Sequence, residues 1–114
     1  MKKIKIGKRW IGEGEPTYVI AEIGSNFDRS LERAKMLIDL ARECGADAAK
    51  FQCFSADKIV SKEGFEGLKS GFQAKWKKPV YEVYKDAEFP REWHQELSQY
   101  CKKRGIDFFS SPYD

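Results

Sequence analysis

Five side chains suited to acid–base or anion-binding chemistry stand within or directly after short apolar runs of this 114-residue sequence: Glu22, Lys50, Gln52, Ser110 and Ser111. A carboxylate can act as a general acid or base, or lie near a metal ion. A lysine amine can bind an anion or form a Schiff base, and serine hydroxyls can donate hydrogen bonds to a phosphate. If the apolar runs are adjacent strands, these residue types together predict a phosphate pocket.

Each of these residues also has a structural interpretation that the sequence leaves open. A charge among apolar residues is costly without a partner, so Lys50 and Glu22 could form an ion pair between neighbouring strands. The two serines could satisfy a turn where a strand ends. Side chains alternate along a strand, which would place Lys50 and Gln52 on the cleft side and Phe51 on the side that faces helices.

The spacing of apolar residues predicts strands and helices in alternation. Compact apolar runs indicate three buried strands, at residues 18–23, 46–53 and 106–110. Apolar residues at three- and four-residue spacing indicate two helices, at residues 31–44 and 90–104. Asp28 or Ser30 is suited to cap the first helix, and Pro90 to occupy the first position of the second. Gly45 and Gly105 are suited to end the helices in the left-handed conformation.

Alternating strands and helices favour parallel strands joined by helical crossovers, and hence an α/β fold. A repeat supports this assignment, because each helix is followed by Gly-x-Asp, at residues 45–47 and 105–107. A complete (β/α)₈ barrel needs roughly 200–250 residues. Residues 1–114 are therefore too few for a whole barrel, and because they stop directly after a strand with no helix to cover it, we expect them to be the front of a larger fold. A hairpin and linker would occupy residues 1–16, and the first three strands with two crossovers would occupy residues 18–114.

The connection at residues 54–88 is far longer than the roughly 2–6 residues of an ordinary loop between a strand and a helix. Its aromatic side chains could form a lid or a sugar-facing wall, or could hold a long loop in place. They are Phe65, Phe72, Trp76, Tyr81 and Tyr84. Residues 79–85 are compatible with a short helical turn.

Composition and charge exclude several classes of function. Lys and Arg total 21 against 18 Asp and Glu, and a net charge of +3 is too small and scattered for a nucleic-acid-binding face. No apolar run approaches the roughly 18–20 residues of a membrane span, and the N-terminus lacks the apolar region of a signal peptide. The three cysteines have neither the even count nor the spacing of a disulfide or zinc framework. These features predict a cytoplasmic protein.

Three further side chains are expected to have structural roles. Cys44 and Cys101 fall near the ends of the two helices, where we expect small buried thiols. His94 is the single histidine and has no partner at metal-ligand spacing. We therefore expect it at a surface or half-buried position of the second helix.

Three strings of residues at the strand ends carry a family resemblance. They are IAEIGSN at residues 20–26, GADAAKFQ at residues 45–52 and FSSPYD at residues 109–114. Together they resemble the opening of the sialic acid synthase family, which includes N-acetylneuraminate, legionaminate and pseudaminate synthases. The resemblance extends from the hairpin to the last residue, and the combination of strings is specific although no single string is.

This resemblance implies that residues 1–114 are the first part of a TIM (β/α)₈ barrel, which condenses phosphoenolpyruvate with a 2-acetamido sugar aldehyde to give a nonulosonic (sialic-type) acid. It assigns Glu22 to catalysis, beside the metal and the sugar, and Lys50 with Gln52 to phosphoenolpyruvate. Ser111, with Ser110 before it, would contact the same ligand. A divalent metal, manganese or magnesium, would polarise the aldehyde. Its histidine ligands would lie outside this segment, in an enzyme that is expected to be a homodimer.

The sequence departs from the family pattern at two places. Asn26-Phe27-Asp28 replaces the common Asn-His-Asn, and residues 54–88 lack the asparagine that contacts the acetamido side of the sugar in some members. Two alternatives stay open: a related synthase acting on an aldose phosphate, and a non-catalytic partial barrel that binds or assembles. We expect the 114 residues alone to be inactive, and their open sheet edges to cause self-association.

Overall fold

The computed structural model describes residues 2–61, 63–64 and 77–113, which contain two separate sheets. The larger sheet has the strand order β3-β4-β5, and both of its pairings are parallel. Its strands are β3 (Ile20–Gly24), β4 (Ala48–Cys53) and β5 (Asp107–Pro112). The smaller sheet is the predicted antiparallel hairpin, formed by β1 (Ile4–Ile6) and β2 (Arg9–Ile11).

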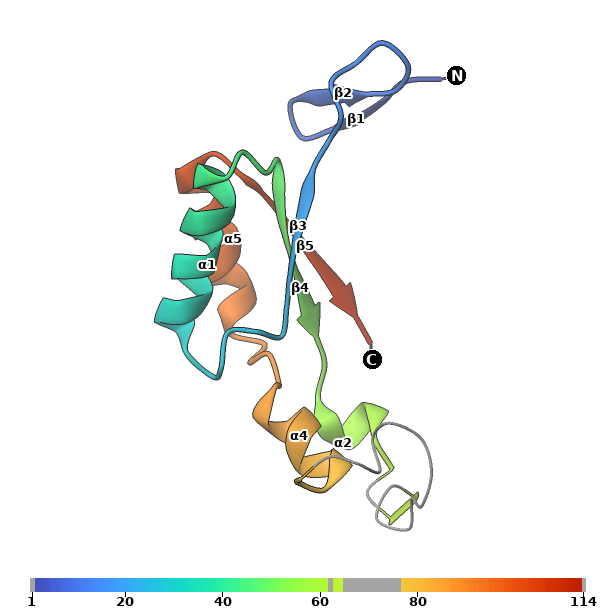
Figure 1. The fold of residues 1–114 in the computed structure, drawn as a ribbon, viewed down its shortest axis with the longest axis vertical. Helices are drawn as coiled ribbons and strands as arrows, with labels where there is room; N and C mark the ends of the chain where they lie inside the picture. Colours follow the sequence, from blue (N-terminus) through green and yellow to red (C-terminus); the bar gives the residue numbers. More distant parts are fainter. Residues whose placement is uncertain (1, 62, 65–76, 114) are drawn as a thin grey trace.

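Two crossover helices cover one face of the parallel sheet (Figure 1). They are α1 (Leu31–Glu43) and α5 (Trp93–Arg104). Two shorter helices, α2 (Ala56–Ile59) and α4 (Val80–Asp86), lie in the long connection after β4. Figure 1 shows them at the end of the sheet opposite the hairpin. The predicted α/β order is therefore confirmed, together with the helical turn within residues 79–85.

The apolar core lies between the two crossover helices and the sheet face that they cover. Its fully or nearly buried side chains include Ala34, Ile38 and Ala41 of α1, Leu97 and Cys101 of α5, and Ala49, Phe51 and Cys53 of β4. The helix residues recur at three- and four-residue spacing and the strand residues at two-residue spacing, as burial on one face requires. Lys50 and Gln52 lie on the opposite face of the sheet, which carries the candidate site.

An aromatic cluster closes this core at the carboxyl end of the sheet. Phe27, in the loop between β3 and α1, is completely buried. Its ring centroid lies 5.5 Å from Trp93, 5.7 Å from Phe89 and 6.2 Å from Phe51. These separations suit tilted and edge-to-face packing, in which aromatic pairs add to the free energy of burial. Phe27 therefore joins the β3–α1 loop to both β4 and α5.

The helix ends follow the predicted signals at three positions. Ser30 is the N-cap of α1, and its Oγ accepts a hydrogen bond from Arg33 N at 3.1 Å. Gly45 follows α1 with φ +87° and Gly105 caps α5 with φ +74°, both in the left-handed region that favours glycine. Ser30 thus marks where α1 begins, and the two glycines mark where each crossover helix ends before the next strand.

Two predictions at the helix ends were wrong. Pro90 does not begin α5, because residues 90–93 form a tighter turn in which Trp93 N donates to Pro90 O at 3.0 Å, and the helix starts at Trp93. Cys44 is exposed, because α1 ends at Glu43 and Cys44 is the C-cap beyond the buried stripe. Cys101 is buried and His94 is half-buried on α5, as predicted.

The aspartates of the two Gly-x-Asp repeats hold the hairpin and the approach to β3 at the amino ends of the strands. Asp47 accepts hydrogen bonds from Arg9 Nη1 and, at 2.7 Å, from Val19 N. Asp107 Oδ2 accepts from the Tyr18 hydroxyl at 2.6 Å, and Asp107 N donates to Asp47 O at 3.0 Å. The repeat thus marks an anchor for the N-terminal segment at the end of the sheet away from the candidate site.

Because of the Tyr18–Asp107 hydrogen bond, we expect the protein to lose stability at alkaline pH. Burial, followed by the hydrogen bond and charge of Asp107, raises the pKa of Tyr18 well above its ordinary value. The folded state therefore keeps a proton that the unfolded chain releases near pH 10, so this stabilisation is complete below pH ~10 and is lost above it. The Tyr18→Phe substitution should flatten the fall of the thermal midpoint between pH 9 and 11.

The matched control is Tyr113→Phe, which alters an exposed tyrosine near the other end of the sheet. It should leave the pH dependence of the midpoint as in the wild type. Parallel curves for wild type and Tyr18→Phe would contradict the assignment of this hydrogen bond.

Candidate functional site

Glu22 on β3 and Lys50 on β4 lie opposite one another in the parallel register. Lys50 Nζ is 3.6 Å from Glu22 Oε2, and the two side chains are 37% and 50% exposed, respectively. The ion pair that was one interpretation of these residues is therefore present. A pair this exposed contributes only ~0–1 kcal/mol to stability. Because an ammonium group has three donors, the pair leaves Lys50 able to bind an anion as well.

The polar side chains at this edge of the sheet lie around Gly24. The register shifts between Glu22 and Gly24, which is a bulge of the kind found beside active sites. Gly24 has φ +62°, and a Cβ there would lie 3.4 Å from Glu22 Oε1, 3.8 Å from Asn26 Nδ2 and 4.0 Å from Gln52 Nε2. Glycine therefore permits the turn and keeps the space between these three side chains open.

The register of β4 and β5 separates the two candidate serines. Gln52 lies opposite Ser111, whereas Phe51 lies opposite Ser110. Because paired residues of parallel strands share a face, Ser111 joins Gln52 while Ser110 is on the helix-facing side. There the side-chain hydrogen bond between Ser110 and Cys53 partly offsets the burial that raises the pKa of the Cys53 thiol. The structure thus brings together Glu22, Lys50, Gln52 and Ser111, and does not place Ser110 with them.

Asn26 belongs to the same cluster, although it was not among the candidates chosen from the sequence. Its Nδ2 donates to Ile23 O at 2.9 Å, which fixes the side chain beside Gly24. The preceding Ser25 has a buried Oγ without a hydrogen-bond partner in the part of the chain described. The signal in the sequence was a polar residue two positions after a glycine that ends a buried strand.

The position where many family members carry histidine lies outside this cluster. Phe27 is completely buried among rings on the helix-facing side of the sheet. Glu22, by contrast, precedes the β3–α1 turn, and Lys50 and Gln52 lie on the opposite face of β4. Residue 27 of this chain is therefore part of the core packing and not of the candidate site.

A cavity of about 270 Å³ adjoins the cluster through Gln52. Its other lining residues are Phe54, Ile59, Val60, Tyr84 and Tyr113. None of these carries a formal charge, so the described wall suits an uncharged group better than a phosphate. Apart from Gln52, the lining consists of aromatic and aliphatic residues, as is usual for small-molecule sites.

Contacts in the long connection support the loop-holding interpretation for two of its aromatic residues. The Tyr84 ring centroid lies 5.7 Å from that of Phe54, and the Tyr81 hydroxyl donates to Asp57. These contacts tie α4 to the segment that follows β4. The three other aromatic residues singled out in this connection, Phe65, Phe72 and Trp76, lie outside the described residues.

Metal-ligating side chains do not gather in groups of three or more within residues 2–61, 63–64 and 77–113. Glu22 supplies one carboxylate at the strand ends, and one such ligand does not by itself hold a divalent ion in place. In the same part of the chain, no helix has the length and apolar character needed to cross a membrane.

Parallel strands with polar side chains gathered at their carboxyl ends define an α/β protein, and that edge of the sheet is where such folds bind ligands. Residues 37–114, more than half of the chain, match the NeuB family. The chain therefore belongs to the NeuB family, which confirms the resemblance to sialic acid synthases.

Individual relatives agree with this membership. The chain is 37% identical to the N-acetylneuraminate-9-phosphate synthase of Homo sapiens over 93% of its length, which covers 29% of that protein. It is 38% identical to pseudaminic acid synthase of Campylobacter jejuni, over 84% of this chain and 28% of that protein. The chain thus spans less than a third of the length of either curated relative.

A solved structure extends the likeness to the fold. The crystal structure of N-acetylneuraminic acid (sialic acid) synthetase from Leptospira borgpetersenii serovar Hardjo-bovis, in complex with citrate, matches with a TM-score of 0.79 at 28% identity. The match covers 99% of this chain and 35% of that one. Homologues of this chain are therefore synthases of sialic-type acids.

Proposed function

We propose that this chain is the first part of a (β/α)₈ barrel that condenses phosphoenolpyruvate with a 2-acetamido sugar aldehyde to form a nonulosonic acid. The observation that carries this proposal is the convergence of Glu22, Lys50 and Gln52 around Gly24 at the carboxyl ends of parallel strands. Barrel enzymes bind their substrates at this end. The synthases among the relatives support the class of reaction.

Each side chain of the cluster has a role that follows from its chemistry. Lys50 provides the positive charge for a phosphate or carboxylate of phosphoenolpyruvate, and Gln52 and Ser111 donate hydrogen bonds to the same ligand. Glu22, half-exposed at the mouth, faces the acceptor sugar and acts as general acid or base on its oxygen. The 3.6 Å separation of Lys50 Nζ and Glu22 Oε2 supports an arrangement in which the two substrates lie side by side.

In the reaction, the C=C electrons of phosphoenolpyruvate form a bond to the aldehyde carbon, whose oxygen takes up a proton and becomes a hydroxyl. Water adds to the resulting cation and loses a proton, and phosphate leaves by cleavage of its C–O bond to give the keto acid. A divalent manganese or magnesium ion supplies polarisation of the aldehyde when bound. The residues that hold this ion belong to other parts of the complete enzyme, and Glu22, the single carboxylate of the described cluster, lies beside it. The residues of this chain bind phosphoenolpyruvate and orient the acceptor in a homodimeric synthase.

The uncharged cavity beside Gln52 favours an acetamido sugar over an aldose phosphate that lacks the acetamido group. The cavity walls include Phe54, Ile59, Val60 and the rings of two tyrosines, which suit the methyl and amide of an acetamido group. A phosphate group in the same place would be desolvated without a cation among these residues.

The test is phosphate release from phosphoenolpyruvate by the full-length protein that carries this chain. With metal present, a 2-acetamido-2-deoxyhexose should support turnover at least ~10-fold faster than a phosphorylated aldose without the acetamido group, since an unfilled pocket costs on the order of 1.4 kcal/mol or more. Faster turnover with the phosphorylated aldose would overturn the choice of acceptor. Absence of release with every aldose would overturn the reaction itself.

A further inference from the structure

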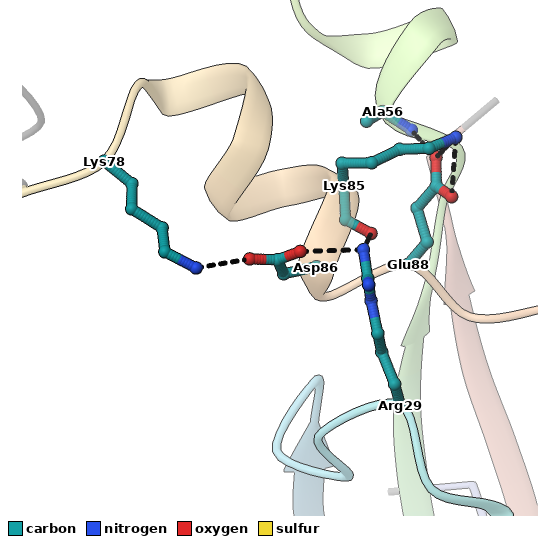
Figure 2. A network of polar contacts seen from close by, with 6 residues as sticks. All are labelled: Arg29, Ala56, Lys78, Lys85, Asp86 and Glu88. Carbon is teal, nitrogen blue, oxygen red and sulfur yellow. Dashed lines mark hydrogen bonds and ion pairs between the residues drawn. The ribbon is translucent and has the colours of Figure 1, made fainter.

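The last residues of α4 and the turn after it contact both loops that leave the candidate site. Figure 2 shows this network, in which Lys85, Asp86 and Glu88 lie between Arg29 of the β3–α1 loop and Ala56 at the start of α2. One loop follows Glu22 and Gly24, and the other follows Gln52. The connection between β4 and α5 therefore returns to the sheet edge from which it departed.

The contact with the start of α2 is made by Glu88. Its Oε1 accepts a hydrogen bond from Ala56 N at 2.7 Å. Ala56 is fully buried, and its amide belongs to the first turn of a helix, where no intrahelical acceptor exists. Glu88 is only 23% exposed and is held by Lys85 Nζ at 3.2 Å. Glu88 is thus the acceptor that fixes the chain four residues beyond Gln52.

The contact with the β3–α1 loop is made by Arg29. Its Nη2 lies 2.7 Å from Asp86 Oδ1 and donates to Lys85 O at 3.3 Å (Figure 2). Asp28 and Arg29 have φ +49° and +57°, a conformation that costs a non-glycine residue energy and persists where surrounding contacts hold it. The same end of α4 therefore restrains both walls of the site.

The two contacts differ in strength. Arg29 and Asp86 are 59% and 42% exposed, so solvent weakens their ion pair. The Glu88–Ala56 hydrogen bond joins a carboxylate to a fully buried amide, and its loss would leave that donor unpaired. Within this network, Glu88 is therefore the residue whose substitution should change the position of side chains in the candidate site.

We propose that Glu88 is a positioning residue of the synthase: through Ala56 it fixes the segment that follows β4 and so sets the place of the Gln52 amide for phosphoenolpyruvate. This role rests on the proposed function, because it assigns Gln52 to that substrate. Glu88 itself contacts the Ala56 amide and is not assigned a contact with a substrate.

The test compares three variants of the full-length protein by steady-state kinetics and by calorimetric titration with phosphoenolpyruvate. Glu88→Ala should raise KM and Kd for phosphoenolpyruvate about tenfold with kcat within twofold, because the loss of one buried charge-assisted hydrogen bond displaces Gln52. Glu88→Gln keeps an oxygen for Ala56 N and should restore most of the affinity. Lys78→Met, at the exposed outer end of the network, is the matched control and should behave as wild type.

Hydrogen exchange of the Ala56 amide gives a second readout, and it should accelerate in Glu88→Ala but not in Lys78→Met. Unchanged KM and Kd in Glu88→Ala, with only a lowered thermal midpoint, would show a purely structural role and overturn the proposal. No binding of phosphoenolpyruvate by the wild type would overturn the proposed function, and the positioning role with it. Tight binding by wild type and Glu88→Ala alike would overturn the positioning role alone.

Discussion

Replacement of Lys50 by methionine in the full-length protein is expected to lower kcat/KM for phosphoenolpyruvate by about 100-fold, or about 2.7 kcal/mol of transition-state stabilisation. Methionine keeps much of the side-chain length and removes the charge. Hydrogen bonds to charged groups contribute about 1.5–3 kcal/mol each, and Lys50 is the cation placed beside Gln52 on the open face of β4. Initial rates at varied phosphoenolpyruvate measure the effect.

Stability should change little in Lys50→Met, because its ion pair with Glu22 is 3.6 Å long and partly exposed. Lys35→Met is a matched control: Lys35 Nζ pairs with Glu96 at 2.7 Å between α1 and α5, the helices that cover the sheet face opposite Lys50. The control should retain wild-type kinetics. Rates within threefold of wild type in Lys50→Met would contradict the assignment of Lys50 to phosphoenolpyruvate.

Phe27→Ala is expected to lower the free energy of unfolding by about 3–5 kcal/mol, the usual cost of removing a buried aromatic ring. The ring is completely buried and packs edge-to-face on Phe89 and Trp93, so its loss leaves a cavity between the β3–α1 loop and α5. Denaturant unfolding of the full-length protein, followed by tryptophan fluorescence near Trp93, measures the change.

Leu40→Ala provides the control for Phe27→Ala, because Leu40 on α1 is 53% exposed and its truncation should cost less than about 1 kcal/mol. Phe27→His adds a second comparison, since histidine fills part of the space but introduces a polar group among rings. It should be intermediate in stability and lose more stability at acid pH, where the imidazole must take up a charge. A cost below about 1 kcal/mol for Phe27→Ala would contradict the core position of residue 27.

Local patterns were sufficient to predict the parallel fold. The apolar runs around Ala49, Phe51 and Ile23 marked buried strands, and the helical spacing of Ala34, Ile38 and Ala41 marked the face that packs on the sheet. These patterns are strong because burial on one face imposes a fixed period. Alternation along β4 also put Lys50 and Gln52 together, and the register confirms that they share the face away from the helices.

Prediction was weaker where the result depends on register between segments far apart in the sequence. Ser110 and Ser111 could not be separated until β5 was paired with β4 residue by residue, since a shift of one position exchanges the two faces. Asn26 entered the cluster only through the bulge at Gly24. Such irregularities have no fixed spacing in the sequence.

Long-range polar contacts were also beyond the sequence patterns. The Gly-x-Asp repeat at residues 45–47 and 105–107 was visible, but not its role in holding Arg9 and Tyr18 at the amino ends of the strands. Glu88 likewise gave no local signal, because its partner Ala56 lies 32 residues earlier. These contacts arise from the return of a long connection to the sheet and follow from the fold.

The most direct test of the proposed site is the crystal structure of the full-length protein with phosphoenolpyruvate bound. We predict an oxygen of the ligand within about 3 Å of Lys50 Nζ, with Gln52 and Ser111 donating to the same molecule and Ser110 directed toward the helices. Phosphoenolpyruvate bound elsewhere, with Lys50 paired to Glu22 alone, would contradict the account.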